Sequence, residues 1–253
     1  MLEITLKQGL ILRKALAPLT EIAEEATFKY SSEGIELIAL NTDSILMGVL
    51  KFRSIDFQHF VCDTEGIGCV DLNLLYETLF FVDNEEYCSV TINHGLCEIG
   101  GPGLHFMFKN CRTLEERYGG IELTERDPEQ ILPDESETEY DLVAAIPSEE
   151  FRCILKHLFF FGHQVFVAIT DKQVKFSALN AEIVLKKELS ECIIGGSAGD
   201  LPVQLSFEME HIRPLMNASL LSNMVWILHS NDSISLQLNF PVGALGNIML
   251  YFT

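Results

Sequence analysis

Five basic side chains are the residues of this chain whose types and spacing best fit a chemical task. Arg13 and Lys14 are adjacent in one apolar segment, Arg152 and Lys156 are four residues apart in a second, and Arg213 lies in a third. Residues four apart share a helix face. Cations on such a face attract phosphate groups of a nucleic-acid backbone. A solvated helix face is the alternative interpretation, since charged helix surfaces are common.

The motifs of the common enzyme classes are missing from the sequence. It contains no phosphate-binding loop ending in Gly-Lys, no dinucleotide-binding glycine motif and no zinc-protease histidine pair. His157 and His163 are six residues apart, which does not place them on one helix face as metal ligands. Ser197 lies in a glycine-rich segment with no histidine nearby in sequence. We therefore expect no catalytic residue, no metal site and no cofactor.

The elements that would carry the basic residues occur twice. The segment I-L-R-K-A-L at 11–16 is followed by an alternating run ending in A-L-N at 39–41, and C-I-L-K-H-L at 153–158 is followed by a similar run ending in A-L-N at 178–180. A repeated unit is typical of an architecture built by duplication. Basic residues at matching places of the repeats favour a surface for a repetitive ligand such as the DNA backbone.

Helical spacing of apolar residues predicts four helices. The first covers about Gly9 to Ala26 with a bend at Pro18. The second covers 73–82 and is capped by Asp71. The third covers 148–161 with Ser148 as N-cap, so that Phe159–Phe161 form a core and helix-end cluster. The fourth lies near 207–218.

Alternating runs predict strands between these helices, including 35–39, 45–49, 104–108, 165–190 and 233–240. Each half therefore follows the order helix, strands, helix, strands. The expected fold class is α+β, with two similar domains that each carry two helices packed on antiparallel sheets. The predicted domains are residues 1–120 and 142–253, joined by an acidic connector at 121–141.

The connector is the most polar part of the chain. Residues 122–141 hold nine acidic side chains and one basic one, together with Pro128 and Pro133. Such a composition has little to bury and predicts an exposed segment. Ile131 and Leu132 are the apolar exceptions, and they either pin the connector to the body or line a binding surface.

Composition limits the classes of partner. The 253 residues are 48% hydrophobic and carry a net charge of −20, so the chain can bury sizeable cores but repels nucleic acid on average. Any DNA contact needs a local basic patch. The seven cysteines form no C-x-x-C pair and are expected to be buried, reduced thiols of an intracellular protein. No stretch of 18 uncharged apolar residues occurs, so no membrane helix is predicted.

Several sequence segments, spread over nearly the whole chain, resemble the proliferating cell nuclear antigen family of DNA sliding clamps. They are the opening M-L-E-I-T-L-K-Q-G-L-I-L-R-K-A-L, then S-S-E-G-I-E-L-I-A-L-N-T-D-S-I, F-Q-H-F-V-C-D at 57–63, D-P-E-Q-I-L-P at 127–133 and the final L-Y-F-T. The resemblance implies a clamp fold whose two-domain protomers assemble head to tail into a trimeric ring around duplex DNA. Ring closure would use the strand near Arg117–Leu123 and the strand near Lys175–Glu182.

The resemblance also implies roles for residues of this chain. DNA-facing bases would be Arg13, Lys14, Arg152, Lys156 and Arg213. A pocket for partner peptides would be formed by Leu40, Ile45, Met47, Ile131, Leu132, Pro133, Ile234 and Tyr251. The implied partners are DNA polymerase, the clamp loader and other replication or repair enzymes with clamp-binding peptides, which places the protein in the nucleus and away from membranes.

The chain departs from the family pattern in its bases. Positions 61–80 contain no Lys or Arg. At five positions where the family usually has a basic residue, this chain has Thr20, Glu77, Phe80, Glu210 and Asn217. Fewer phosphate contacts predict looser DNA binding with a smaller salt dependence.

Three functions compete at this point. The first is a homotrimeric processivity clamp, and the second is one subunit of a heterotrimeric clamp of the checkpoint or replicative type, whose partners supply the missing bases. The third is an enzyme with an acidic metal site at Asp83, Glu85 and Glu86, a segment that we interpret as a charged loop.

Overall fold

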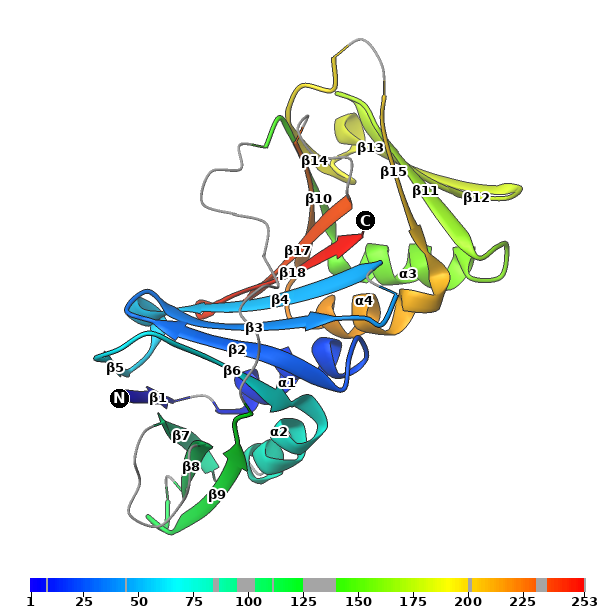
Figure 1. Ribbon diagram of the computed structural model, residues 1–253. Helices are drawn as coiled ribbons and strands as arrows, with labels where there is room; N and C mark the ends of the chain where they lie inside the picture. Colours follow the sequence, from blue (N-terminus) through cyan, green and yellow to red (C-terminus); the bar gives the residue numbers. More distant parts are fainter. Residues whose placement is uncertain are drawn as a thin grey trace. The chain divides into compact units, whose positions relative to one another are not determined.

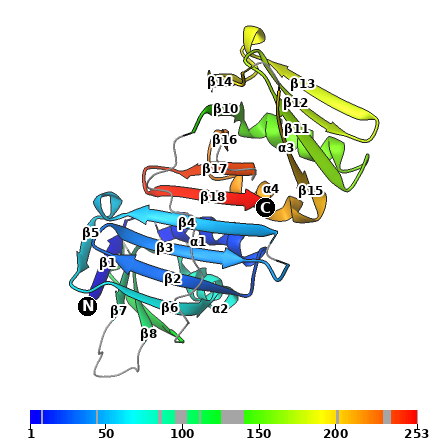
Figure 2. The same cartoon turned by 45° about the horizontal axis from the view of Figure 1, so that its top comes forward.

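The chain forms two compact units of helices and antiparallel strands, which confirms the α+β class. The computed structural model describes residues 1–7, 9–43, 45–83, 87–94, 103–110, 112–124, 140–199, 202–230 and 236–252. Unit 1 comprises Met1–Leu40, Val49–Ile131 and Val242–Asn247. Unit 2 comprises Asn41–Gly48, Leu132–Pro241 and Ile248–Thr253. Figures 1 and 2 show the elements of each unit from two directions.

Unit 1 contains two sets of hydrogen-bonded strands. The first has the order β5-β1-β7-β8-β9, and the second has the order β4-β3-β2-β6. Neighbouring strands with a described register run antiparallel, for example β1 against β7 and β2 against β3. The strand bounds are β1 Leu2–Leu6, β2 Glu25–Ser31, β3 Gly34–Leu40, β4 Leu46–Arg53, β5 His59–Cys62, β6 Gly66–Asp71, β7 Tyr87–His94, β8 Gly103–Asn110 and β9 Glu116–Glu122.

Two helices cover the strands of unit 1. Helix α1 spans Gly9–Thr20, and α2 spans Leu72–Thr78, followed by a 3-10 turn at Leu79–Asp83. Helix α1 packs on α2 and β7, and α2 packs on β2, β6 and β9. The buried face of α1 is formed by Leu12, Ala15, Leu16 and Leu19, which recur at helical spacing. This spacing leaves Lys14 exposed to solvent.

Unit 2 repeats this arrangement with its own strands. One set has the order β13-β12-β11-β15, and the other follows β14-β10-β16-β17-β18. Strand β10 is largely buried: Leu142, Ala144 and Ile146 face the core from one side, and Ala145 on the other side is buried too. The bounds are β10 Leu142–Pro147, β11 Gln164–Ile169, β12 Gln173–Ala178, β13 Ala181–Lys186, β14 Ile193–Gly196, β15 Val203–Glu208, β16 Met224–His229, β17 Leu236–Val242 and β18 Gly246–Phe252.

The helices of unit 2 are α3, Ser148–Leu158, and α4, Ile212–Ala218. Helix α3 packs on β10, β12, β13 and β16 through Phe151, Ile154, Leu155 and Leu158. Short 3-10 turns at Ser54–Asp56, Lys187–Leu189 and Met209–His211 complete the described elements. No helix among the described residues is long and apolar enough to cross a membrane.

Several expected boundaries are wrong. The first helix ends at Thr20 instead of Ala26, because Glu25–Ser31 pairs with β3 and β6 as a strand. The fourth begins at Ile212, because residues 203–208 pair with β11. The third ends at Leu158, and Phe159–Phe161 are a helix-end turn whose side chains are 52, 83 and 39% exposed, not a core cluster.

The two predicted helix caps have different outcomes. Asp71 is confirmed, since its Oδ1 accepts a hydrogen bond from the Leu74 backbone N–H at 2.8 Å. Ser148 is wrong as a cap, because Pro147 holds the N-cap position and the buried Ser148 Oγ has no hydrogen-bond partner within the described structure.

The cysteine expectation holds only in part. The four cysteines with described side chains are free thiols. Cys69 and Cys192 are buried, whereas Cys153 on α3 is exposed. Burial raises the pKa of the Cys192 thiol, because removal from water disfavours the thiolate.

Candidate functional site

The basic residues of α1 face different surroundings. Lys14 is exposed and makes no ion pair within the described part of the chain. Arg13 is half-buried, and its guanidinium lies over the ring of Tyr76, 4.4 Å from the centroid, and near Phe80 at 5.4 Å. Such cation–π contacts hold the arginine against α2 and the turn that follows it. Lys14 is therefore the α1 base most available to a ligand.

Helix α3 repeats this difference. Lys156 is exposed near the C-terminal end of the helix. Arg152 is half-buried, and its Nη1 donates a 2.7 Å hydrogen bond to the backbone carbonyl of Ser219, just after α4. A charged donor satisfies this carbonyl at the end of a helix, where carbonyl groups lack intrahelical partners. Arg152 therefore links α3 to the end of α4 besides carrying charge.

The fifth predicted base, Arg213, is exposed in the first turn of α4. It belongs to unit 2 together with Arg152 and Lys156, whereas Arg13 and Lys14 belong to unit 1. Their assignment to DNA contact stays a prediction. What the structure adds is that each unit presents an exposed lysine on its longer helix, beside an arginine with an intramolecular contact.

The predicted partner pocket is described only in part. Leu40, Ile45 and Met47 are half-buried, and Tyr251 is 3% exposed with its hydroxyl 3.5 Å from the Met249 sulfur. The Asn41 Oδ1 accepts hydrogen bonds from the backbone N–H groups of Ile45 and Leu46, which fixes the turn before β4. Outside the described residues lie Ile131, Leu132, Pro133 and Ile234. The pocket therefore stays a prediction.

The two histidines and the serine considered in the sequence, His157, His163 and Ser197, are all exposed. The His157 ring lies 5.1 Å from that of Phe161. Ser197 Oγ accepts a hydrogen bond from the Gly199 N–H within its turn. The acidic segment Asp83, Glu85 and Glu86 lies outside the residues whose side chains are described.

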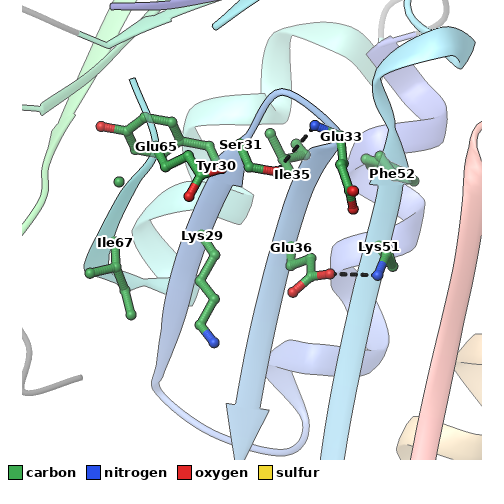
Figure 3. Close-up of a pocket in the computed structure, with 12 residues that line it drawn as sticks. Lys29, Tyr30, Ser31, Glu33, Ile35, Glu36, Lys51, Phe52, Glu65 and Ile67 are labelled. Carbon is green, nitrogen blue, oxygen red and sulfur yellow. Dashed lines mark hydrogen bonds and ion pairs between the residues drawn. The ribbon is translucent and has the colours of Figure 1, made fainter. Parts of the chain in front are cut away.

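A concave site in unit 1 was not predicted. It has a volume of about 440 Å³ and lies on the strands β2, β3, β4 and β6. Figure 3 shows Lys29, Glu36 and Lys51 side by side there, with Glu36 Oε1 2.8 Å from Lys51 Nζ. The alternation of residues along each strand indicates which charged side chains share a face of the sheet. Only the pairing register of β2 and β3, with Lys29 opposite Glu36, shows that these charges are neighbours. Acids and bases mix in this cavity, which gives it no clear preference for an anion or a cation.

Comparison with known families decides the identity of the fold. Residues 1–117 match the N-terminal domain of proliferating cell nuclear antigen, and residues 134–253 match its C-terminal domain. The chain belongs to the proliferating cell nuclear antigen family. The two matches cover both repeats seen in the sequence, so this clamp carries both domains of the family and has the clamp fold. Membership supports a DNA sliding clamp role, and clamps of this family are non-enzymatic scaffolds.

Proposed function

We propose that this chain forms a homotrimeric ring that encircles duplex DNA in the nucleus and tethers DNA polymerase as its processivity factor. Further partners would be the clamp loader and other replication or repair proteins with clamp-binding peptides. The observation that carries the proposal is the pair of family matches over both halves of the chain. Tethering requires no catalytic residue, metal or cofactor, so we propose that the chain is not an enzyme.

The strand order supports closure of a ring. Strand β9 is at the edge of its set in unit 1, and β13 is at the edge of its set in unit 2. Edge strands present unpaired N–H and C=O groups that can pair with another chain. The expected edge near Lys175–Glu182 is corrected here, because Lys175–Ala178 belong to the interior strand β12 and the edge begins at Ala181.

Exposed apolar side chains accompany both edges. Tyr118 on β9 is 69% exposed, and Leu179 in the turn between β12 and β13 is 82% exposed. The largely exposed Phe160 follows the end of α3, which packs on β13. Head-to-tail contact between copies would bury such surface, which stabilises association.

A subunit of a heterotrimeric clamp is the second candidate. This candidate is favoured by two positions at which the family usually has a basic residue. Here these positions hold Phe80, which is 63% exposed, and Glu210, which is exposed and acidic. Partner subunits with more bases would compensate for these replacements.

Size-exclusion chromatography with light scattering on the purified chain separates the two candidates. We expect about three times the protomer mass of 28.5 kDa at micromolar concentration. A monomer would count against the homotrimer and favour the heterotrimer. A primer-extension assay on circular template then tests processivity, and no gain in product length with polymerase and loader present would contradict the tethering role.

A further inference from the structure

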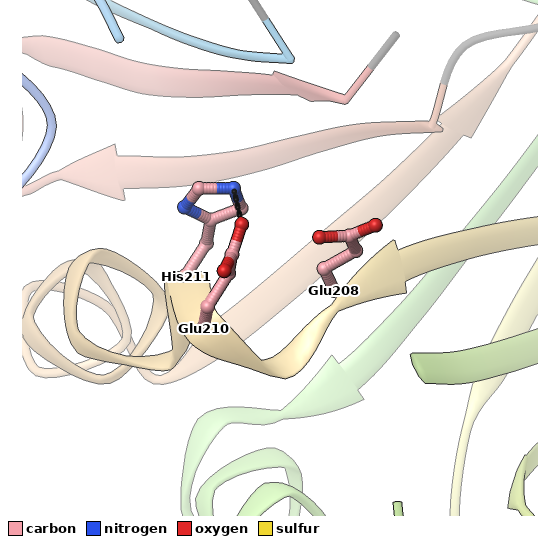
Figure 4. A group of neighbouring side chains, drawn as sticks. All are labelled: Glu208, Glu210 and His211. Atoms are coloured by element: carbon pink, nitrogen blue, oxygen red, sulfur yellow. Dashed lines mark ion pairs between the residues drawn. The ribbon is translucent and has the colours of Figure 1, made fainter. Parts of the chain in front are cut away.

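Two carboxylates and one imidazole gather where β15 leads into α4. Glu208 ends β15, and Glu210 and His211 lie in the 3-10 turn that precedes the helix. One ligand atom from each side chain lies within 4.8 Å of the other two. Figure 4 shows the three side chains on the same side of this turn, with the Glu210 carboxylate directed to the imidazole. All three belong to unit 2.

The imidazole of His211 has a nitrogen without a hydrogen bond. Its Nε2 is covered from solvent and has no hydrogen-bond partner within the described structure. Glu210 Oε1 lies 3.5 Å from this nitrogen and forms an ion pair with it when the ring is protonated, but the contact lacks hydrogen-bond geometry. Buried polar atoms without a partner are rare in native proteins and require an explanation. Two explanations are available for His211 Nε2: a proton on the ring that pairs it with Glu210, or a cation bound between the ring and the Glu210 carboxylate.

The spacing fits a cation. Ligand atoms about 2.1 Å from a tetrahedral zinc ion lie about 3.4 Å from each other, close to the distance between His211 Nε2 and Glu210 Oε1. Glu208 is exposed, so its side chain has room to approach by the remaining distance. Two carboxylates balance the charge of a divalent ion when the imidazole is neutral. Three protein ligands leave one position for water.

We propose that Glu208, Glu210 and His211 form a binding site for a divalent transition-metal ion of the zinc type. The nitrogen ligand selects this class, because Mg²⁺ and Ca²⁺ prefer oxygen ligands alone. The site differs from the sequence expectation of no metal. It does not depend on the proposed clamp function, since binding can be measured on the free protein.

Calorimetric titration of the metal-free protein with Zn²⁺ tests the site. The wild type is compared with Glu208→Gln and Glu210→Gln, which remove a charged ligand from an exposed position and leave the shape unchanged. Loss of one of three ligands is expected to weaken binding at least about tenfold. His211→Gln tests the third ligand, with circular dichroism to confirm folding because this side chain is only 14% exposed.

Glu188→Gln is the matched control, because Glu188 is an exposed acid of unit 2 outside the cluster. It should bind Zn²⁺ like the wild type. Zinc binding to any of the seven cysteines is common to all variants and cancels in the comparison. Equal affinity in wild type, Glu208→Gln and Glu210→Gln, or no saturable binding at all, overturns the proposal and leaves His211 and Glu210 as an ion pair. Mg²⁺ binding as tight as that of Zn²⁺ excludes His211 as a ligand.

Discussion

At the scale of single residues, the four bases of α1 and α3 divide into two kinds. Lys14 and Lys156 extend into solvent, while Arg13 stacks on aromatic rings and Arg152 bonds to a backbone carbonyl. Replacing all four by Ala would therefore mix a loss of charge with a loss of internal contacts. The two lysines alone give the cleaner test of DNA attraction.

The double variant Lys14→Ala, Lys156→Ala should bind duplex DNA more weakly without a change in stability. Each lysine that contacts a phosphate contributes up to about 0.9 to the slope of log affinity against log salt, so this slope should become smaller. Fluorescence anisotropy at several salt concentrations measures it. The control Lys7→Ala, Lys172→Ala also removes one exposed lysine from each unit, but from positions outside the helices and outside the two edge strands. An equal loss in both double variants would show that only net charge matters.

Gly34 illustrates a different constraint on a single residue. It begins β3 with a φ of 152°, and a Cβ there would collide with the carbonyl oxygen of Phe52. Gly34→Ala should therefore destabilise the protein by about 1–3 kcal/mol in urea unfolding. Gly195→Ala is the matched control, because a Cβ at Gly195 meets no atom within 4 Å. Equal midpoints for the two variants would contradict the steric argument.

At the scale of elements, the start of α2 depends on one side chain. The Asp71 carboxylate accepts the Leu74 N–H, which has no intrahelical partner. Asp71→Ala should cost about 1 kcal/mol of unfolding free energy. Asp63→Ala removes an exposed carboxylate that caps no helix and should change stability little. Indistinguishable unfolding curves for the two variants would mean that water replaces the cap without loss.

The connector makes a second prediction at this scale. A peptide with a glutamine, a spaced aliphatic residue and paired aromatic residues should bind the predicted pocket, in which Ile131 and Leu132 would cover its anchors. Changing both to Ser should weaken binding at least about tenfold, or about 1.4 kcal/mol, while the oligomeric state is unchanged. Isothermal titration with this peptide measures the effect. Unchanged affinity would mean that the two residues only anchor the connector.

Sequence patterns predicted the existence of elements better than their ends. Helical spacing located the four α-helices found among the described residues, because their buried faces recur at regular intervals. It overextended the first helix, because Ile22 and Ala26 continue the spacing although strand pairing begins at Glu25. The same error hid the candidate metal site. A helix over 207–218 would turn Glu208 and Glu210 to different faces, whereas the observed strand end and turn gather them with His211.

Residue roles were the least predictable part of the site. The positions of the bases on helices followed from spacing, but the tether of Arg152 to Ser219 joins residues far apart in sequence. The cavity beside Lys29 likewise required strand register. Local patterns contain neither kind of information, because both depend on which distant segments become neighbours.

At the scale of the whole molecule, the net charge of −20 acts on two processes with opposite sign. Protomers of like charge repel each other, and salt screens this repulsion. Raising NaCl from about 50 to about 300 mM should therefore strengthen self-association while it weakens DNA binding. Analytical ultracentrifugation and anisotropy measure the two effects. Salt-induced dissociation of the proposed trimer would instead show that ion pairs dominate its interfaces.

The composition of unit 1 has a consequence for how the protein is made. This unit includes Val242–Asn247, and the Leu245 carbonyl accepts a hydrogen bond from the Arg53 N–H at 3.4 Å. A ribosome releases residues 242–247 only after almost all of unit 2 has been translated. Unit 1 therefore lacks its last segment during most of synthesis. A chain truncated before residue 242 would also leave unit 1 incomplete, although the truncation point lies nearly 200 residues after Arg53 in the sequence.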